Sequence, residues 1–227
     1  MFSPILVTGI PRSGTSVIAQ VLCECGAFVG NVTKMQENIE ILHTEQELYN
    51  SLGGDPNAQF PILDTENLSI PNNWRTKIIK ILSNQGYNDS VPWMYKSHLI
   101  TLLWPVWRQA FPYAKWVIVR RKPTEIIQSC RLTGYMKAFK NPENVEEIGG
   151  RTEEDGWKWM VSRYEQEFVK LINSGADVKV VWPHRIVYGD YSQLIELVNW
   201  AGLKWRPDIL PVIDFKFLKV RRRNGIG

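Results

Sequence analysis

The feature that most constrains this chain is a glycine-spaced loop that follows its first apolar run. Residues 5–9 are Ile-Leu-Val-Thr-Gly, and the chain then passes through Ile-Pro-Arg-Ser to Gly14 and into a helical pattern of apolar residues. The glycines let the backbone curl tightly, so the amides from Ser13 to Ser16 can point at an anion at the positive end of the next helix. The pattern therefore predicts a strand, a phosphate-binding loop and a helix.

This loop has the glycine spacing of a Walker loop but lacks the Walker lysine. Thr15 stands where a nucleotide triphosphatase carries the Lys that reaches the β- and γ-phosphates. The cation of the loop is Arg12, which follows Pro11. Because the lysine is missing, the loop favours a phosphate ester other than a nucleoside triphosphate.

Alternating segments along the chain predict an α/β fold, a doubly wound and mainly parallel sheet with helices on both faces. After the strand at 4–8 we expect strands at residues 91–96, 115–120 and 178–182, with a further strand piece at 185–188. We expect helical segments at residues 17–26, 35–52, 74–82, 99–111, 123–132, 153–174 and 191–201, and a mobile loop at 140–152. Ligands of such a sheet bind at the carboxyl ends of its strands, where the glycine loop lies.

Length, charge and cysteine content narrow the class of protein. A chain of 227 residues is expected to form one domain, over residues 1–227. The net charge is +4, and basic residues cluster at 120–122 and 221–223, which indicates a few anion sites and no nucleic-acid track. Three cysteines without metal-ligand spacing indicate reduced thiols. No apolar run reaches the ~18 residues that span a bilayer and no signal peptide is expected, so we predict a cytoplasmic protein.

Two further motifs place basic and hydroxyl residues at expected strand ends. Arg121 follows one strand and Ser129 lies two turns into the next helix, so both can reach one phosphate. Lys96 and His98 follow another strand in the stretch Tyr-Lys-Ser-His. A histidine whose pKa is about 6.5 is mostly neutral near pH 7 and can take a hydroxyl proton. Alternatively, His98 is an ordinary packing residue without a catalytic role.

Together these motifs resemble those of sulfotransferases that use 3′-phosphoadenosine 5′-phosphosulfate. Pro-Arg-Ser-Gly-Thr-Ser, at residues 11–16, resembles the loop that binds the 5′-phosphosulfate. Arg121, Pro123 and Ser129 match the spacing of the motif that holds the 3′-phosphate, and Lys-Ser-His at 96–98 resembles the stretch that carries the catalytic base. The resemblance implies transfer of a sulfuryl group to a hydroxyl or amine, with adenosine 3′,5′-bisphosphate as the second product and no metal.

The same resemblance implies a role for each matching residue. His98 would be the base, while Arg12 and Lys96 would stabilise charge on the leaving oxygen. The donor would be held by Arg12, Ser13, Gly14, Thr15, Ser16, Arg121, Ser129, Tyr188, Arg222, Arg223 and Gly225. Tyr188 is expected beside the adenine, and the C-terminal residues of this set are expected to close over the 3′-phosphate.

The sequence departs from the family pattern in two places. Val17 stands where many members have a Trp that stacks on adenine, and Gly189 stands where an acidic residue is usual. The acceptor stays open among small molecules, sugars, lipids and peptides, and so does the oligomeric state. Two alternative functions remain, a P-loop nucleotide kinase or triphosphatase, and a binding protein of the same fold without catalysis.

Overall fold

The computed structural model describes residues 2–213, and its centre is a sheet of four parallel strands. The strands are β1 (Ile5–Gly9), β2 (Met94–Lys96), β3 (Lys115–Val119) and β4 (Asp177–Val181), in the spatial order β2-β1-β3-β4. Ile5 lies opposite both Met94 and Lys115, and Lys115 lies opposite Asp177. The carboxyl ends of all four strands therefore share one edge, as the predicted α/β fold requires.

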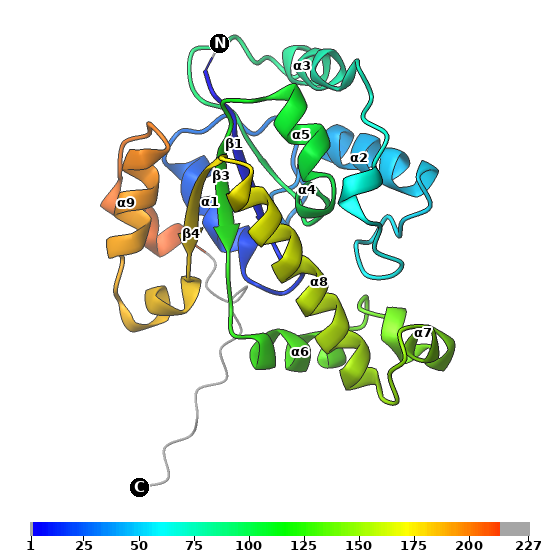
Figure 1. Cartoon of the computed structure of the whole chain (residues 1–227). Helices are drawn as coiled ribbons and strands as arrows, with labels where there is room; N and C mark the ends of the chain where they lie inside the picture. The colour runs from blue at the N-terminus through cyan, green and yellow to red at the C-terminus, as the bar shows by residue number, and fades with distance from the viewer. Residues whose placement is uncertain (1, 214–227) are drawn as a thin grey trace, which may run out of the picture.

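Helices cover both faces of this sheet (Figure 1). One face packs against α1 (Thr15–Glu24), α9 (Ser192–Trp200) and the 3₁₀ helix η4 (Pro207–Val212). The other face lies on the side of α2 (Ile39–Ser51), α3 (Trp74–Asn84), α4 (Leu99–Leu102), α5 (Trp104–Ala110), α6 (Pro123–Leu132), α7 (Pro142–Glu147) and α8 (Glu153–Asn173). Three short 3₁₀ helices are η1 (Thr65–Asn67), η2 (Ala138–Lys140) and η3 (Pro183–Tyr188).

Successive side chains of β1 go to opposite faces of the sheet. Ile5 and Val7 belong to the apolar cluster around α1 and α9, whereas Leu6 belongs to the cluster around α4, α5 and α8. All three side chains are fully buried. A strand that is buried on both faces needs apolar residues at every position, which explains the unbroken apolar run in the sequence.

The predicted helix at 99–111 is confirmed in part, because the structure has two helices there with a break at Leu103. α4 ends at Leu102 and α5 begins at Trp104, with Pro105 in the first turn of α5. Proline has no N–H to donate to the preceding turn, and it is tolerated in the first turn of a helix. The break therefore lies just before the proline.

The predicted mobile loop at 140–152 is wrong, since η2 and α7 fill most of it. The side chain of Asn141 caps α7 by accepting from the amide of Glu143 at 3.2 Å. Thr152 and Asp155 form a capping box at the start of α8, in which each side chain accepts from the backbone of the other. Caps at both ends thus fix a polar segment that carries no long apolar pattern.

The predicted strand piece at 185–188 is wrong as well. Residues 183–188 form the 3₁₀ helix η3, which begins at Pro183 and ends at Gly189 with φ 79°. Arg185 holds this turn through a 3.1 Å ion pair with Asp190. A glycine is suited to that left-handed position, and a proline is tolerated in the first turn of a helix.

Two elements begin three or four residues later than predicted. β2 begins at Met94 rather than residue 91, and α2 begins at Ile39 rather than Met35. The Asn38 side chain caps α2 by accepting from the Ile41 amide at 3.2 Å. All three cysteines are free, and no helix within residues 2–213 is long and apolar enough to cross a membrane.

Candidate functional site

The glycine loop joins β1 to α1, and both of its glycines are required by the backbone. A Cβ on Gly9 would lie 2.5 Å from Ser13 Oγ and 2.6 Å from the carbonyl oxygen of Val119, so no larger residue fits. Gly14, which precedes α1, adopts φ 98°, in the left-handed region that favours glycine. The loop can therefore fold back against β3 and turn sharply into the helix.

This loop leaves several hydrogen-bond donors without a protein acceptor. The Ser13 amide donates to the carbonyl of Ile10 at 3.0 Å, but the amides of Gly14, Thr15 and Ser16 have no acceptor within residues 2–213. Ser13 is fully buried, and its hydroxyl also lacks a partner there. A buried polar group without a partner costs free energy, and these donors gather at the positive end of α1. The arrangement fits an anion.

The structure brings the second motif against this loop. Arg12 Nε donates to Ser129 Oγ on α6 at 3.0 Å, and Arg121 Nη1 donates to the carbonyl oxygen of Arg12 at 3.1 Å. Arg121 also pairs through Nε with Glu125 at 2.9 Å. Nη2 of both arginines has no partner within residues 2–213. Two cations and a hydroxyl from distant parts of the sequence thus share one edge of the sheet.

Tyr135 is a neighbour of Arg12 that the sequence analysis missed. Its ring centroid lies 5.8 Å from Arg12 Cζ, and its hydroxyl accepts from Arg12 Nη1 at 3.4 Å. The buried side chain of Gln59 holds the turn that carries Tyr135, because its amide donates to the Tyr135 carbonyl at 3.1 Å and its oxygen accepts from the Lys137 amide at 2.8 Å. Half of Tyr135 is exposed. No sequence pattern links this tyrosine to Arg12.

At the end of β2, the predicted Lys96 is paired with a residue that the sequence analysis also missed. Its ammonium contacts Glu37 Oε1 at 2.6 Å, and the lysine side chain is only 1% exposed. Burial lowers the pKa of Lys96, and Glu37 opposes that effect. A buried ammonium needs a counter-charge, so the sequence could indicate that an acidic partner exists but not which one.

His98 stands against the glycine loop. Its Nδ1 lies 2.9 Å from the carbonyl oxygen of Gly9. A carbonyl can only accept, so Nδ1 carries the proton and Nε2 of the neutral ring keeps its lone pair. Burial, together with the positive charges of Lys96 and Arg12, lowers the pKa of His98 from 6.5 to about 4. The ring is therefore neutral at pH 7 and can accept a proton at Nε2.

The buried carboxyl group of Glu45 stabilises the end of β2. Glu45 on α2 accepts from the Tyr95 hydroxyl and from Trp107 Nε1, each at 2.8 Å, and it is fully buried. Burial raises its pKa to about 7, although the hydrogen bonds from Ser97, Tyr95 and Trp107 oppose the rise. Tyr95 and Ser97 flank Lys96 in the chain, so this network fixes the backbone that carries Lys96 and His98.

A structural comparison assigns the architecture. A sulfotransferase from Alicyclobacillus acidocaldarius superposes with a TM-score of 0.57, over 92% of this chain and 88% of its own. The chain has a sulfotransferase-like fold. The two sequences are 12% identical, so this similarity shows the fold alone. No family model matches the sequence, and a search of curated proteins finds no match.

Other residues of the predicted donor site are exposed or lie outside the described part of the chain. Tyr188 is 80% exposed at the end of η3, so it does not follow a strand as the sequence analysis expected. Val17 is fully buried against the sheet, so nothing can stack on it. Three predicted donor-binding residues lie outside the described part of the chain: Arg222, Arg223 and Gly225. Within residues 2–213, no group of three or more His, Cys, Asp and Glu side chains could hold a metal.

Proposed function

We propose that this protein is a sulfotransferase that moves a sulfuryl group from 3′-phosphoadenosine 5′-phosphosulfate to a hydroxyl or amine. The observation that carries the proposal is the contact of Arg12 with Ser129 and Arg121, which joins two separate phosphate motifs at the carboxyl edge of the sheet. A donor with phosphate groups at both its 3′ and 5′ positions needs two such sites side by side. The sulfotransferase-like fold supports the same activity.

The residues present fit this donor. The 5′-phosphosulfate would lie at the free amides of Gly14, Thr15 and Ser16, where Ser13 Oγ also lacks a partner. The 3′-phosphate would lie at Arg121 and Ser129. Charge-assisted hydrogen bonds of arginine to phosphate are strong, and Nη2 of Arg121 can make one without giving up the contact with Glu125.

Sulfuryl transfer of this kind depends on positioning and charge stabilisation. The loop amides and Arg12 stand where negative charge would develop on the leaving phosphate oxygen. His98 would take the acceptor's proton at Nε2, because its Nδ1 proton is held by the Gly9 carbonyl. Lys96 would add positive charge, with Glu37 as the positioning residue that holds its ammonium.

Isothermal calorimetry with adenosine 3′,5′-bisphosphate and with ATP tests the donor site. We expect the bisphosphate to bind without Mg²⁺ and more tightly than ATP, because the loop has no Walker lysine and has a second phosphate site. Tighter binding of ATP that requires Mg²⁺ would instead support a P-loop kinase or triphosphatase. Bisphosphate binding without turnover of labelled donor over a broad acceptor screen would support a non-catalytic binding protein.

A further inference from the structure

Arg12 occupies a backbone conformation that a residue with a side chain seldom adopts. Its φ is 76°, in the left-handed region, where any residue other than glycine is strained. Two contacts hold it there: its carbonyl oxygen accepts from Arg121 Nη1, and its Nε donates to Ser129 Oγ. Such strain persists only where the surrounding contacts over-determine the conformation, so every contact of Arg12 affects the geometry of the site.

Tyr135 makes the third contact of Arg12, and it is the one that the proposed donor does not share. Arg121 and Ser129 are the proposed ligands of the 3′-phosphate, so a bound donor would compete for their hydrogen-bonding groups. The centroid of the Tyr135 ring lies 5.8 Å from Arg12 Cζ, and the Tyr135 hydroxyl accepts from Nη1 at 3.4 Å. The attraction between a cation and an aromatic ring remains when the donor binds.

The guanidinium group of Arg12 is planar, so two fixed nitrogens set the direction of the third. Ser129 fixes Nε and Tyr135 fixes Nη1, while Nη2 has no partner within residues 2–213 and is left for a ligand. A hydrogen bond of 3.4 Å is long, so we expect the Tyr135 ring to contribute more than its hydroxyl.

The turn that carries Tyr135 is held by a buried side chain from a distant part of the chain. Gln59 is 4% exposed, and its amide donates to the Tyr135 carbonyl at 3.1 Å. Its oxygen accepts from the amides of Lys137 at 2.8 Å and Ala138 at 3.2 Å. One buried side chain therefore satisfies three backbone groups of this turn, and a satisfied buried network fixes the backbone around it.

The segment that carries Gln59 is itself strained and tightly held. Ala58 adopts φ 59°, and its carbonyl oxygen accepts from the Tyr164 hydroxyl on α8 at 2.8 Å. The Asp55 carboxylate accepts from the amides of Gln59 at 2.9 Å and Phe60 at 3.2 Å. The protein thus keeps an unfavourable backbone conformation next to the side chain that holds the turn, as is common around functional sites.

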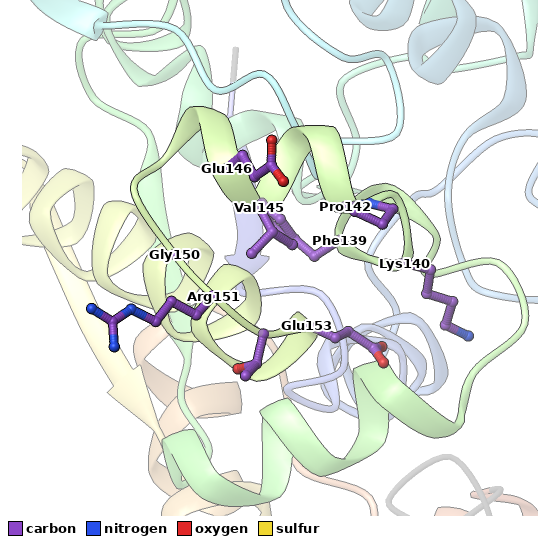
Figure 2. A pocket seen from close by; sticks show the side chains of 9 residues that line it. Phe139, Lys140, Pro142, Val145, Glu146, Gly150, Arg151 and Glu153 are labelled. Carbon is purple, nitrogen blue, oxygen red and sulfur yellow. The ribbon is translucent and has the colours of Figure 1, made fainter.

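An aromatic contact fixes the far end of the same turn, where it continues into η2. Figure 2 shows the Phe139 side chain of η2 in the wall of a pocket that α7 and the start of α8 also line. The Phe139 ring is 1% exposed, and its centroid lies 5.0 Å from that of Trp157 and 5.5 Å from that of Phe60. Gln59 and Phe60 therefore hold the turn at two points, and the half-exposed ring of Tyr135 stands on a fixed backbone.

Resting on the proposed function, we propose that Tyr135 is a positioning residue of the transfer site. Its ring keeps the Arg12 guanidinium directed at the donor while the 3′-phosphate engages Arg121 and Ser129. Gln59 acts on Arg12 through Tyr135. Removal of Tyr135 should therefore affect donor affinity and kcat only where Arg12 is present, and should leave the acceptor KM nearly unchanged.

The first test needs no donor. NMR measures the exchange of the Arg12 Nε proton with water, and the resonance is assigned by its absence in Arg12→Ala. We expect exchange about fivefold faster in Tyr135→Ala, and near the wild-type rate in Tyr135→Phe, which keeps the ring. Tyr113→Ala is the control, because Tyr113 is 83% exposed and precedes β3 at the opposite edge of the sheet. Unchanged exchange in Tyr135→Ala would overturn the proposal.

The second test is a double-mutant cycle between Arg12 and Tyr135. In the wild-type background, Tyr135→Ala should lower bisphosphate affinity about fivefold and kcat about tenfold, with the acceptor KM within about twofold. In the Arg12→Ala background the same substitution should change neither quantity, because the group that it positions is gone. Tyr135→Phe should restore most of both losses, and Gln59→Ala should show the same dependence on Arg12.

Two outcomes of the cycle would also overturn the proposal. Losses that persist in the Arg12→Ala background would show a general effect on the fold, and a raised acceptor KM with unchanged kcat would place Tyr135 at the acceptor. Failure of the proposed function is seen separately, as absence of bisphosphate binding to the wild type, because the NMR test involves no donor.

Discussion

The glycine loop and the end of β2 lie at the same edge of the sheet, but they differ in whether their polar groups have hydrogen-bond or ion-pair partners. In the loop, Ser13 Oγ and the amides that follow it have no partner in the described structure. At the end of β2, Lys96 is paired with Glu37 and His98 contacts the Gly9 carbonyl. The loop therefore offers free donors to a ligand, whereas the polar groups at the end of β2 have partners within the protein.

Because of this difference, we expect the two regions to affect different quantities: donor affinity for the loop, and turnover or stability for the end of β2. The loop should set the affinity for an anionic donor, because its amides and Ser13 Oγ have no protein partner and are free to bind that ligand. Side chains at the β2 end should affect turnover or stability and leave donor affinity nearly unchanged, because their partners are already present. Each prediction below tests one side of that contrast.

The largest effect is expected for His98→Ala. Loss of the base should lower turnover by roughly 10²–10⁴, with bisphosphate affinity within about twofold. Arg12→Ala should instead reduce both quantities, because Arg12 stands at the donor in the ground state and meets more charge in the transition state. Turnover and calorimetry on the same folded preparations make the comparison. Turnover within a few fold of the wild type would identify His98 as a packing residue.

The pH dependence of turnover by the wild-type protein tests the role of His98 further. Because the pKa of His98 is lowered to about 4, the neutral ring should persist far below pH 6.5. The acid limb of kcat/KM that His98 causes should therefore lie near pH 4, and NMR titration of the His98 ring should give the same midpoint. A midpoint near 6.5 in both measurements would show that the ring is solvated in the functional protein.

Glu45→Gln should have the next largest effect, on stability. The pKa of Glu45 is raised to about 7 from 4.5, so the folded state binds its proton more tightly and stability falls as pH rises through that window. The difference in unfolding free energy across the window is up to about 3 kcal/mol, and the variant should lack it. Denaturant unfolding at pH 5 and pH 8 measures this.

Two controls accompany that measurement. The first concerns His98, whose lowered pKa gives stability that is present above pH 6.5 and lost as pH falls towards 4, opposite in sign to the Glu45 effect. This contribution is the same in both proteins, so it cancels when the unfolding free energy of the variant is subtracted from that of the wild type. Glu47→Gln removes an exposed carboxyl group from the same helix and should leave the difference between pH 5 and pH 8 as it is. An equal change in both variants would mean that Glu45 is not the group responsible.

The smallest effect is expected for Arg121→Ala, on the loop side of the contrast. Removal of one charge-assisted hydrogen bond should lower affinity for adenosine 3′,5′-bisphosphate about tenfold or more. Adenosine 5′-phosphosulfate has no 3′-phosphate, so its affinity should hardly change. Arg131→Ala, an exposed arginine on the same helix as Ser129, is the control. Equal losses for both ligands would place Arg121 elsewhere or give it a purely structural role.

Where local patterns carried the information, the sequence predicted the fold well. The strand expected at residues 4–8, the loop after it and the helix expected at 153–174 match β1, its loop and α8 to within one residue, because continuous burial and helical periodicity are visible in the sequence. The strand expected at 185–188 is instead η3, since short segments near proline and glycine are decided by caps and turns. The segment at 140–152 is helical for the same reason, through the caps at Asn141 and Thr152.

The sequence alone determined the glycine loop and predicted that it binds phosphate, because glycine spacing, the arginine after proline and the missing lysine are local properties of residues 9–15. Only the tertiary structure decided which distant side chains meet there. Glu37 reaches Lys96, and Tyr135 reaches Arg12, because parallel strands bring their carboxyl ends to one edge and the loops that follow then pack on one another. Such pairings depend on the path of the chain in space, and no spacing along the sequence predicts them.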